Sequence, residues 1–318
     1  MIGMSLPYKW LLENKNDMST PAELLPKLWE RGVRSIEIRA VSAGGDPVEV
    51  LRVASLLWDH GFNVTVHSTC KTAENAVAEV LEPLSLMVAN MRQSELTVTL
   101  HPIVGDNAEM LLALSDFIIE KGYPVKIALE NNRKMPDNSD GDSVALVLDA
   151  VTRANRKNVG ICFDMGHLAW YADKFTDTPD MLPPKEFLSR VIHTHIHAYE
   201  EGTTHYPIYT WRKPFSRYIE ALAPKYYGVY NVELSPSRFE HIMSAEEGYL
   251  ISADTLRSNL PALASVFDGI RENYDNSFKD VTDMLEKKDG CYFHLSVRRR
   301  THSIRTDLSG EWTLPSGI

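Results

Sequence analysis

The sequence predicts an α/β fold in which eight parallel strands alternate with helices and close into a (β/α)8 TIM barrel. Three observations predict it. Strand-like and helix-like segments alternate along most of the 318 residues, and ionisable residues recur at the strand ends every 29 to 36 residues, about one βα unit. No G-x-G-x-x-G turn follows the first strand, as an open, doubly wound sheet usually requires.

Eight short runs are predicted as strands. Each is mostly apolar, which is typical of a parallel strand covered by helices on its outer face. The runs cover residues 5–10, 33–39, 62–68, 96–102, 125–131, 159–165, 191–197 and 230–236, of which the first is the weakest. Strict alternation with helices implies parallel pairing through right-handed crossovers.

The segments between these runs carry helix signals. Thr20 and Asp46 are predicted N-caps, each is followed by a proline, and Gly32 and Gly61 end the two helices. Further helices are predicted over residues 72–92, 106–122, 143–157, 184–191, 216–228 and 252–273. We therefore expect a catalytic barrel over residues 1–274 and a C-terminal extension of unknown role over 275–318.

Composition narrows the function classes. The net charge of −10 argues against broad nucleic-acid binding, which needs a basic face. Three cysteines are too few for a disulfide scaffold and indicate a reducing compartment, so a cytoplasmic location is expected. The N-terminus lacks the pattern of a secretory signal, and no apolar run approaches the ~18 residues of a membrane span. A homo-oligomer is left open.

Seven predicted strands end in an ionisable side chain. In chain order these are Glu37, His67, His101, Glu130, Asp164, His197 and Glu233. Their spacing predicts one ring at the C-terminal mouth of the barrel, where barrel enzymes place their active sites. A buried carboxylate is costly unless it is paired or bound to a metal. Because carboxylates favour Mg2+ and Mn2+ and imidazole favours Zn2+ and its neighbours, the ring predicts a divalent metal and leaves Mn2+, Co2+, Mg2+ and Zn2+ open.

Two motifs place further histidines near this ring. In D-M-G-H, one loop is expected to present Asp164 and His167 to the same cavity. In H-T-H-I-H, the three histidines have period two and should point to one side of the seventh strand, with His197 nearest the mouth. His193 is expected to be a satisfied core histidine, and His195 is left open between the core and an orienting role.

Four segments carry a family resemblance. ALEN (128–131), FDMGH (163–167), HIHAYE (195–200) and VELSP (232–236) resemble the xylose-isomerase-like TIM barrel superfamily. That superfamily includes sugar (phosphate) isomerases and epimerases, and endonuclease IV. The similarity covers roughly residues 5–274, and its motifs are specific for the superfamily but not for one member.

The resemblance implies a metal site. Epimerases of the superfamily bind one Mn2+, Co2+ or Mg2+ at positions that match Glu130, Asp164, His197 and Glu233. It also implies that His167 contacts the substrate and that the two glutamates transfer protons.

The resemblance to endonuclease IV implies additional ligands. That enzyme holds three zinc ions and has metal ligands at positions matching His67, His101 and His167. It also uses an Asp-x-His motif after the seventh strand, where this chain has Thr203 in place of the aspartate and keeps His205. A second metal at His67, His101 and His205 therefore stays open.

These features together predict a metal-dependent isomerase or epimerase of a sugar, sugar phosphate or polyol. The metal would stabilise an enediolate as a Lewis acid while Glu130 and Glu233 move the proton, assisted by His167. Substrate contacts are expected from Glu37, His67, His101, His167 and Arg212. The alternative for Glu37 is an ion pair with Arg39.

Other classes remain in competition. An endonuclease IV-like phosphodiesterase acting on abasic DNA would need phosphate-contacting cations at the mouth, for which the sequence offers only 131–134 and 211–213. We therefore expect a mouth without a basic surface and a small sugar-like substrate rather than nucleic acid. A lyase or dehydratase using similar enolate chemistry is the third candidate. A binding protein without catalysis is disfavoured by the paired carboxylates.

Overall fold

The computed structural model describes residues 1–13, 20–41, 45–141, 143–200, 203–223 and 225–260. The chain divides into two compact units, Met1–Ile270 and Arg271–Ile318, and all described residues belong to the first. The predicted boundary at residue 274, the extension 275–318 and the end of the last predicted helix lie outside the described residues. They stay predictions.

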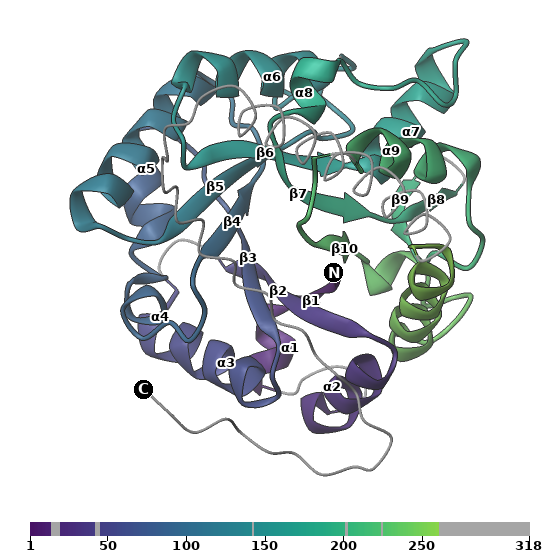
Figure 1. The fold of residues 1–318 in the computed structure, drawn as a ribbon, viewed down its shortest axis with the longest axis horizontal. Coiled ribbons are helices and arrows are strands. Elements are labelled where there is room, and N and C mark those ends of the chain that lie inside the picture. The colour runs from purple at the N-terminus through teal and green to yellow at the C-terminus, as the bar shows by residue number, and fades with distance from the viewer. Residues whose placement is uncertain (14–19, 42–44, 142, 201–202, 224, 261–318) are drawn as a thin grey trace, which may run out of the picture. The chain divides into compact units, whose positions relative to one another are not determined.

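Eight parallel strands close into a barrel, as the sequence predicts (Figure 1). The strands follow one another around it in the order β1-β10-β7-β6-β5-β4-β3-β2, and all neighbouring pairs are parallel. They are β1 (Ile2–Pro7), β2 (Val33–Val41), β3 (Asn63–Ser68), β4 (Leu96–Leu100), β5 (Val125–Glu130), β6 (Val159–Asp164), β7 (Val191–Ile196) and β10 (Tyr230–Val232). The strands are almost entirely buried, as their apolar sequences require.

Helices surround the barrel (Figure 1). They are α1 (Tyr8–Glu13), α2 (Pro21–Glu30), α3 (Pro47–Asp59), α4 (Ser85–Ala89), α5 (Asn107–Lys121), α6 (Ser143–Ala154), α7 (Met165–Phe175), α8 (Lys185–Leu188) and α9 (Lys213–Leu222), with single turns η1 (Val77–Leu81) and η2 (Pro236–Arg238). Residues 245–260 are also helical. Asp46 caps α3 by accepting a hydrogen bond from the Val48 backbone N–H at 2.9 Å, as predicted.

Several predicted elements have different bounds, among them the first strand and the helix over 72–92. The first strand begins at Ile2 rather than residue 5 and ends at Pro7, because Tyr8 already begins α1. The helix predicted over 72–92 is replaced by the two short pieces η1 and α4. Pro83 lies between them, and proline has no N–H to continue a helical hydrogen-bond ladder.

Two elements were missed near the mouth. The D-M-G-H segment is not a loop, because Asp164 ends β6 and caps α7, accepting the His167 backbone N–H. After β7 the chain forms a separate antiparallel hairpin of β8 (Ala198–Glu200) and β9 (Thr203–Tyr206). His205 lies on β9 with a positive φ of 68°.

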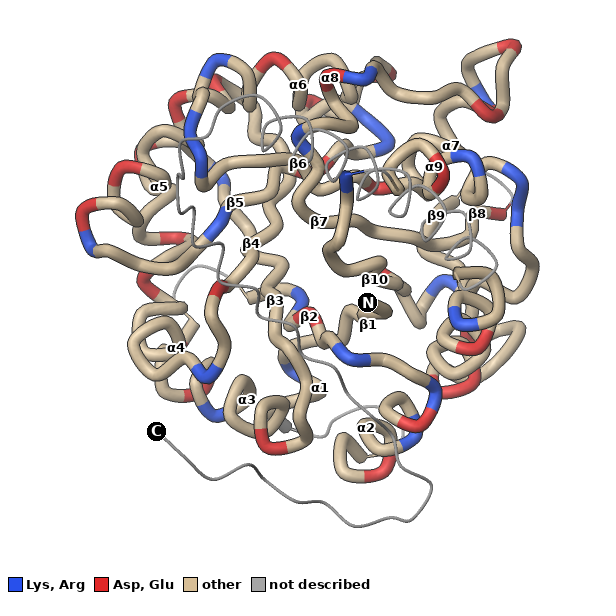
Figure 2. The backbone as a smooth tube through the Cα atoms, viewed as in Figure 1, with Lys and Arg blue, Asp and Glu red and all other residues tan. Residues whose placement is uncertain are grey.

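Positions of Lys, Arg, Asp and Glu are spread over the outer helices and loops (Figure 2). In the described part of the chain, no helix is both long enough and apolar enough to cross a bilayer.

The cap of α5 provides a stability test of the fold. The Asp106 carboxylate accepts the backbone N–H groups of Ala108 and Glu109 at 2.9 and 3.2 Å and pairs with Arg153 at 2.6 Å. Asp106→Ala should lower the free energy of unfolding by about 1–2 kcal/mol in a urea titration. Asp116→Ala, which removes only an exposed ion pair with Arg156, should cost less than about 1 kcal/mol. Equal losses in the two variants would contradict the capping role.

Candidate active site

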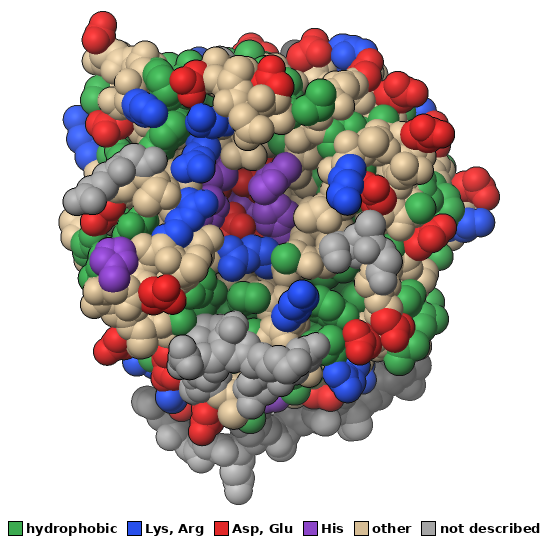
Figure 3. Space-filling model, turned by 180° about the vertical axis from the view of Figure 1, so that it is seen from behind, with side chains coloured by type: hydrophobic (Ala, Val, Ile, Leu, Met, Phe, Trp, Pro, Cys, Tyr) green, Lys and Arg blue, Asp and Glu red, His purple; other side chains and the backbone are tan. Residues whose placement is uncertain are grey.

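The C-terminal ends of the barrel strands bring acidic and imidazole side chains together. Figure 3 shows them at the floor of a hollow on one face of the molecule. Glu130 and Asp164 are the last residues of β5 and β6, and Glu233 directly follows β10. All three carboxylates are buried. Burial of so many charges is costly unless opposite charges or a cation compensate them.

His195 on β7 lies at the centre of this group. Its Nδ1 atom is 3.1 Å from Glu130 Oε2, 3.2 Å from Glu233 Oε2 and 3.9 Å from Asp164 Oδ2. In the strand register, His195 is paired with Asp164 of the neighbouring strand β6 on one side and with Asn231 of the neighbouring strand β10 on the other. Three carboxylates from three strands therefore converge on one nitrogen. The sequence left His195 undecided, because this convergence depends on the register between strands.

Glu37 holds the other side of this imidazole. Its Oε2 atom is 3.1 Å from His195 Nε2 and 3.1 Å from His193 Nε2. Oε1 accepts hydrogen bonds from the Asn231 amide at 3.1 Å and from the Ser5 hydroxyl. Glu37 therefore fixes the His195 ring with Nδ1 toward the three carboxylates.

Glu37 is fully buried, so its position differs from the predicted strand end. Strand β2 continues to Val41, which places Glu37 in mid-strand below the mouth and Arg39, two residues later, nearer to it. The ion pair that Arg39 forms is with Glu233, at 3.6 Å, rather than with Glu37. Glu37 thus contacts His193, His195 and Asn231, and its predicted contact with a substrate stays a prediction. His193 is a satisfied core histidine, as expected.

His67 and His101 stand beside Glu130. His67 Nε2 and His101 Nε2 lie 3.6 and 3.5 Å from Glu130 Oε2, and His67 Nδ1 lies 3.5 Å from Glu233 Oε1. The two rings are 4.8 Å apart. His67 is buried whereas the His101 side chain is 48% exposed, so His101 faces the opening.

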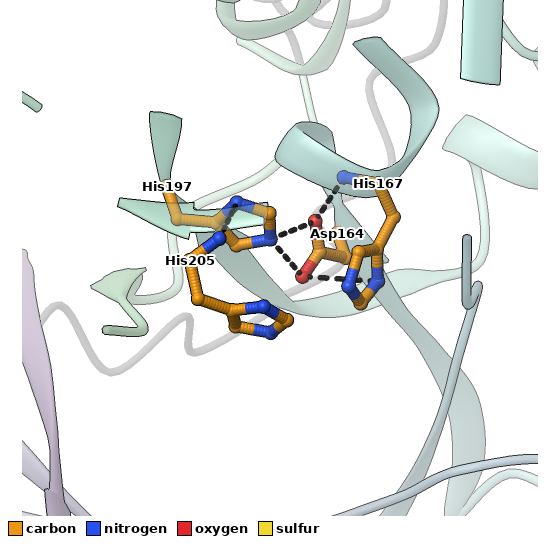
Figure 4. Close-up of side chains that lie close together, drawn as sticks. All are labelled: Asp164, His167, His197 and His205. Carbon is orange, nitrogen blue, oxygen red and sulfur yellow. Dashed lines mark hydrogen bonds and ion pairs between the residues drawn. The ribbon is translucent and has the colours of Figure 1, made fainter. Parts of the chain in front are cut away.

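A second group contains Asp164, His167, His197 and His205 (Figure 4). His197 Nε2 lies 3.1 Å from both oxygens of Asp164, and His197 Nδ1 accepts the His205 backbone N–H at 3.1 Å. Both nitrogens of His197 therefore already have partners. His167 Nδ1 links the two groups, at 3.3 Å from Asp164 Oδ2 and 3.4 Å from Glu130 Oε1.

The four predicted metal ligands therefore divide between two groups. Glu130 and Glu233 join His67 and His195, whereas Asp164 and His197 join His167 and His205; within each group the ligand atoms lie within 4.8 Å of one another. The possible second set of His67, His101 and His205 is not brought into one cluster. His67 lies in the first group, His205 lies in the second, and His101 is in neither. His205 is nevertheless near the first group, because its Nε2 atom is 3.5 Å from Glu233 Oε2.

The pKa values of the site residues reflect the close packing of carboxylates and histidines. Burial raises the pKa values of Glu130 and Glu233, but neighbouring histidines outweigh it and hold both well below the usual range. Burial disfavours the charged form of His167, yet Asp164 and Glu130 raise its pKa to about 9. Burial, with the nearby His197, lowers the pKa of His205 to about 3, so this ring is neutral at pH 7.

Several buried polar atoms have no hydrogen-bond partner among the described residues. They include both oxygens of Glu130, Glu233 Oε2, His195 Nδ1 and His167 Nε2. Buried polar groups are normally satisfied, so a group of unsatisfied ligand atoms is typical of a cation site. The carboxylate and imidazole chemistry of these atoms fits a divalent transition metal.

The expectation of a mouth without basic side chains is wrong. Figure 3 shows Lys and Arg side chains around the hollow that contains the histidines. Arg39 approaches Glu233, and Arg238 donates to Thr204 O at 2.8 Å and Thr203 Oγ1 at 3.1 Å. Arg39 was expected only as an alternative partner of Glu37, and Arg238 lies in a turn after the eighth barrel strand. Neither was therefore predicted to lie at the mouth.

The predicted substrate residue Arg212 precedes α9. Its guanidinium lies 4.4 Å from the ring centre of Tyr199, which is a cation–π contact. No described contact links it to the acidic group, and its role in substrate binding stays a prediction.

No protein-family model matches the sequence, and no curated protein matches it. Among solved structures, the chain is similar to a xylose isomerase domain protein from Alicyclobacillus acidocaldarius subsp. acidocaldarius, with a TM-score of 0.52, 16% identity, and 84% of this chain and 99% of that chain covered. A putative xylose isomerase from Rhodospirillum rubrum ATCC 11170 has a TM-score of 0.51 and 15% identity, with 82% and 98% covered. A D-psicose 3-epimerase has a TM-score of 0.49 and 15% identity, with 83% and 99% covered. The first two similarities confirm the (β/α)8 TIM barrel fold.

Gly166 tests the packing around His197. A Cβ atom at Gly166 would lie 2.2 Å from His197 Cε1, so Gly166→Ala must displace the ring that holds Asp164. We expect a loss of about 1–3 kcal/mol in the free energy of unfolding, measured in urea with a chelator present. In the control Gly141→Ala, the new Cβ would meet only the flexible Met135 side chain, and the loss should be under about 1 kcal/mol. An unchanged stability for Gly166→Ala would contradict this packing.

Proposed function

We propose that this protein is a metal-dependent isomerase or epimerase of a sugar-like substrate. The observation that carries the proposal is the convergence of Glu130, Asp164 and Glu233 on His195 Nδ1 at the mouth of the barrel. The xylose-isomerase-like fold supports it, because such barrels place their active sites at this end.

We propose as metal ligands Glu130, Glu233 and His195 from one group and Asp164 from the neighbouring group, with His195 in place of the predicted His197. His195 Nδ1 makes no hydrogen bond among the described residues and faces only the carboxylates that would share the cation, whereas His197 Nδ1 accepts the His205 backbone N–H. Glu37 behind His195 directs that Nδ1 toward the carboxylates, and His197 holds the Asp164 carboxylate in the same way. When bound, a divalent cation supplies Lewis acidity that stabilises negative charge on adjacent substrate oxygens.

Glu130 and Glu233 are the proposed proton-transfer groups. They come from β5 and β10, on different sides of His195, so each can serve a different position of a bound substrate. One carboxylate removes a proton from the carbon next to a carbonyl and thereby becomes the acid that returns a proton to the neighbouring carbon; inversion at the same carbon requires the opposite carboxylate to have taken up a proton first. Both groups are buried, which shields the carbanionic substrate from bulk water during the step, and their protons exchange with solvent between turnovers.

His101, His67 and His167 are proposed to orient the substrate. His101 is the most exposed of the three and can donate a hydrogen bond from its ring to a hydroxyl entering the mouth. The buried Nε2 of His167 has no partner among the described residues and offers a second contact.

The endonuclease alternative keeps one supporting observation, the basic side chains at the mouth. Against it, the aspartate of its Asp-x-His motif is replaced by Thr203 in this chain. A lyase or dehydratase would use the same proton abstraction and differ in the loss of a leaving group. Product analysis therefore separates it from an isomerase.

Metal binding tests the ligand set. We expect one divalent metal per chain by elemental analysis of protein purified without added metal. His195→Gln and Asp164→Asn should weaken Mn2+ binding at least about tenfold in a competition titration, because each removes a ligand. His197→Gln should weaken it less, because it removes only a support of Asp164. A larger loss in His197→Gln than in His195→Gln would restore the original assignment, and three zinc ions per chain would favour the nuclease.

Proton exchange tests the chemistry. Incubation with ketoses, aldoses, sugar phosphates and inositol derivatives in D2O should give deuterium at one carbon of the substrate that is turned over, read by NMR. Glu233→Gln should reduce this exchange about 10²–10⁴-fold, because it removes a general acid/base. Glu240→Gln, an exposed glutamate, is the matched control and should leave it unchanged. No exchange with any compound, together with metal-dependent nicking of abasic DNA, would reject the isomerase.

A further inference from the structure

Three arginines reach the mouth from three different elements. Arg39 is in the last part of β2, Arg133 is in the loop after β5, and Arg238 ends η2 after β10. Among the described residues, neither Arg133 nor Arg238 has a carboxylate within ion-pair distance, and the one carboxylate beside Arg39 is Glu233. Glu233 is itself a proposed metal ligand, so its charge is shared with the cation.

These positive charges act on one another. Burial lowers the pKa of Arg238, and the positive charges of Arg133 and Arg39 lower it further. Their mutual repulsion has a cost that a bound anion would relieve. The hydroxyls of a neutral sugar need both hydrogen-bond donors and acceptors from the protein. Guanidinium groups without a carboxylate partner only donate, so they add little binding free energy for a neutral sugar.

A cavity of about 380 Å³ begins beside the metal-ligand group. Its polar lining includes Ser68, Thr69, His101, Arg133 and Lys134. His101 lines the cavity and also lies beside the proposed metal ligands, because its Nε2 atom is 3.5 Å from Glu130 Oε2. The volume is within the range of small-molecule sites, ~300–1,000 Å³. A substrate whose reacting carbons lie over Glu130 can therefore extend its far end to Arg133 and Lys134.

We propose that the substrate is anionic, a sugar-type molecule whose phosphate or carboxylate group binds Arg133 and Lys134 in this cavity while Arg39 and Arg238 add positive charge across the mouth. This rests on the proposed function and names its substrate class. Arg133 provides a planar donor pair that matches two oxygens of either group. Lys134 is only weakly engaged, since Asp140 lies 3.9 Å away and both side chains are partly exposed. The hydroxyls of Ser68 and Thr69 add neutral donors.

The experiment compares each neutral sugar with its phosphate ester and its sugar acid on the metal-loaded protein. Binding is measured by calorimetry and turnover by exchange in D2O. The anionic member of a pair should bind at least about tenfold more tightly than the neutral one. Arg133→Gln should reduce that binding by about 10–100-fold, as expected for a charged hydrogen-bonding pair. Lys134→Gln is the second variant, and Arg156→Gln, an exposed arginine on the outside of the barrel paired with Asp116, is the matched control.

The outcomes separate the two proposals. Exchange on neutral sugars with no preference for anionic ones would overturn the anionic substrate and leave the isomerase standing. Preferential binding of an anionic sugar that depends on Arg133, without exchange, would support the subsite and reject the isomerase. Whichever of the phosphate and carboxylate arms is more sensitive to Arg133→Gln identifies the group. Tight, salt-sensitive binding of duplex DNA that is lost in Arg133→Gln, with no preference among the sugars, would overturn the proposal in favour of a phosphodiester substrate.

Discussion

The site depends on how the barrel compensates several buried carboxylates. Glu37, Glu130, Asp164 and Glu233 all lie out of contact with bulk water, where each charge needs a partner. Seven histidines supply those partners, and His195 is common to all four carboxylates. Glu37 approaches Nε2 of the His195 ring, and the other three carboxylates approach Nδ1. His195 therefore lies between Glu37, which is deeper in the barrel, and the three carboxylates proposed as metal ligands at the mouth.

This layering follows from the alternation of side chains along the strands. On β7, residues two apart point to the same side, so His193 and His195 meet Glu37 while His197, just past the strand, reaches Asp164. The same rule on β2 buries Glu37 and brings Arg39 to Glu233. Asp164 serves two purposes, since its Oδ1 atom caps α7 by accepting the His167 backbone N–H, and its Oδ2 atom lies beside His167 Nδ1 and His197 Nε2. Helix α7 and the acidic group therefore depend on one carboxylate.

The repeat length and the apolar strands were sufficient to predict the barrel, because both express the βα unit directly. The ring of ionisable residues was also predictable, since strand ends of a parallel barrel meet at one edge. The features that depend on the register between neighbouring strands could not be predicted. The sequence could not show that β2 extends past Glu37, or that His195 rather than His197 faces the three carboxylates. The basic mouth was missed for a related reason, because Arg39 and Arg238 become neighbours only when the first and last parts of the barrel close.

We propose that His195 and three carboxylates form one metal site. The most direct test is an anomalous diffraction map collected at the manganese absorption edge from crystals grown with Mn2+. We expect one peak, bound by Glu130, Asp164, Glu233 and His195 Nδ1, with His197 still directed at Asp164. A peak bound by His197 instead of His195, or no peak near these carboxylates, would contradict it.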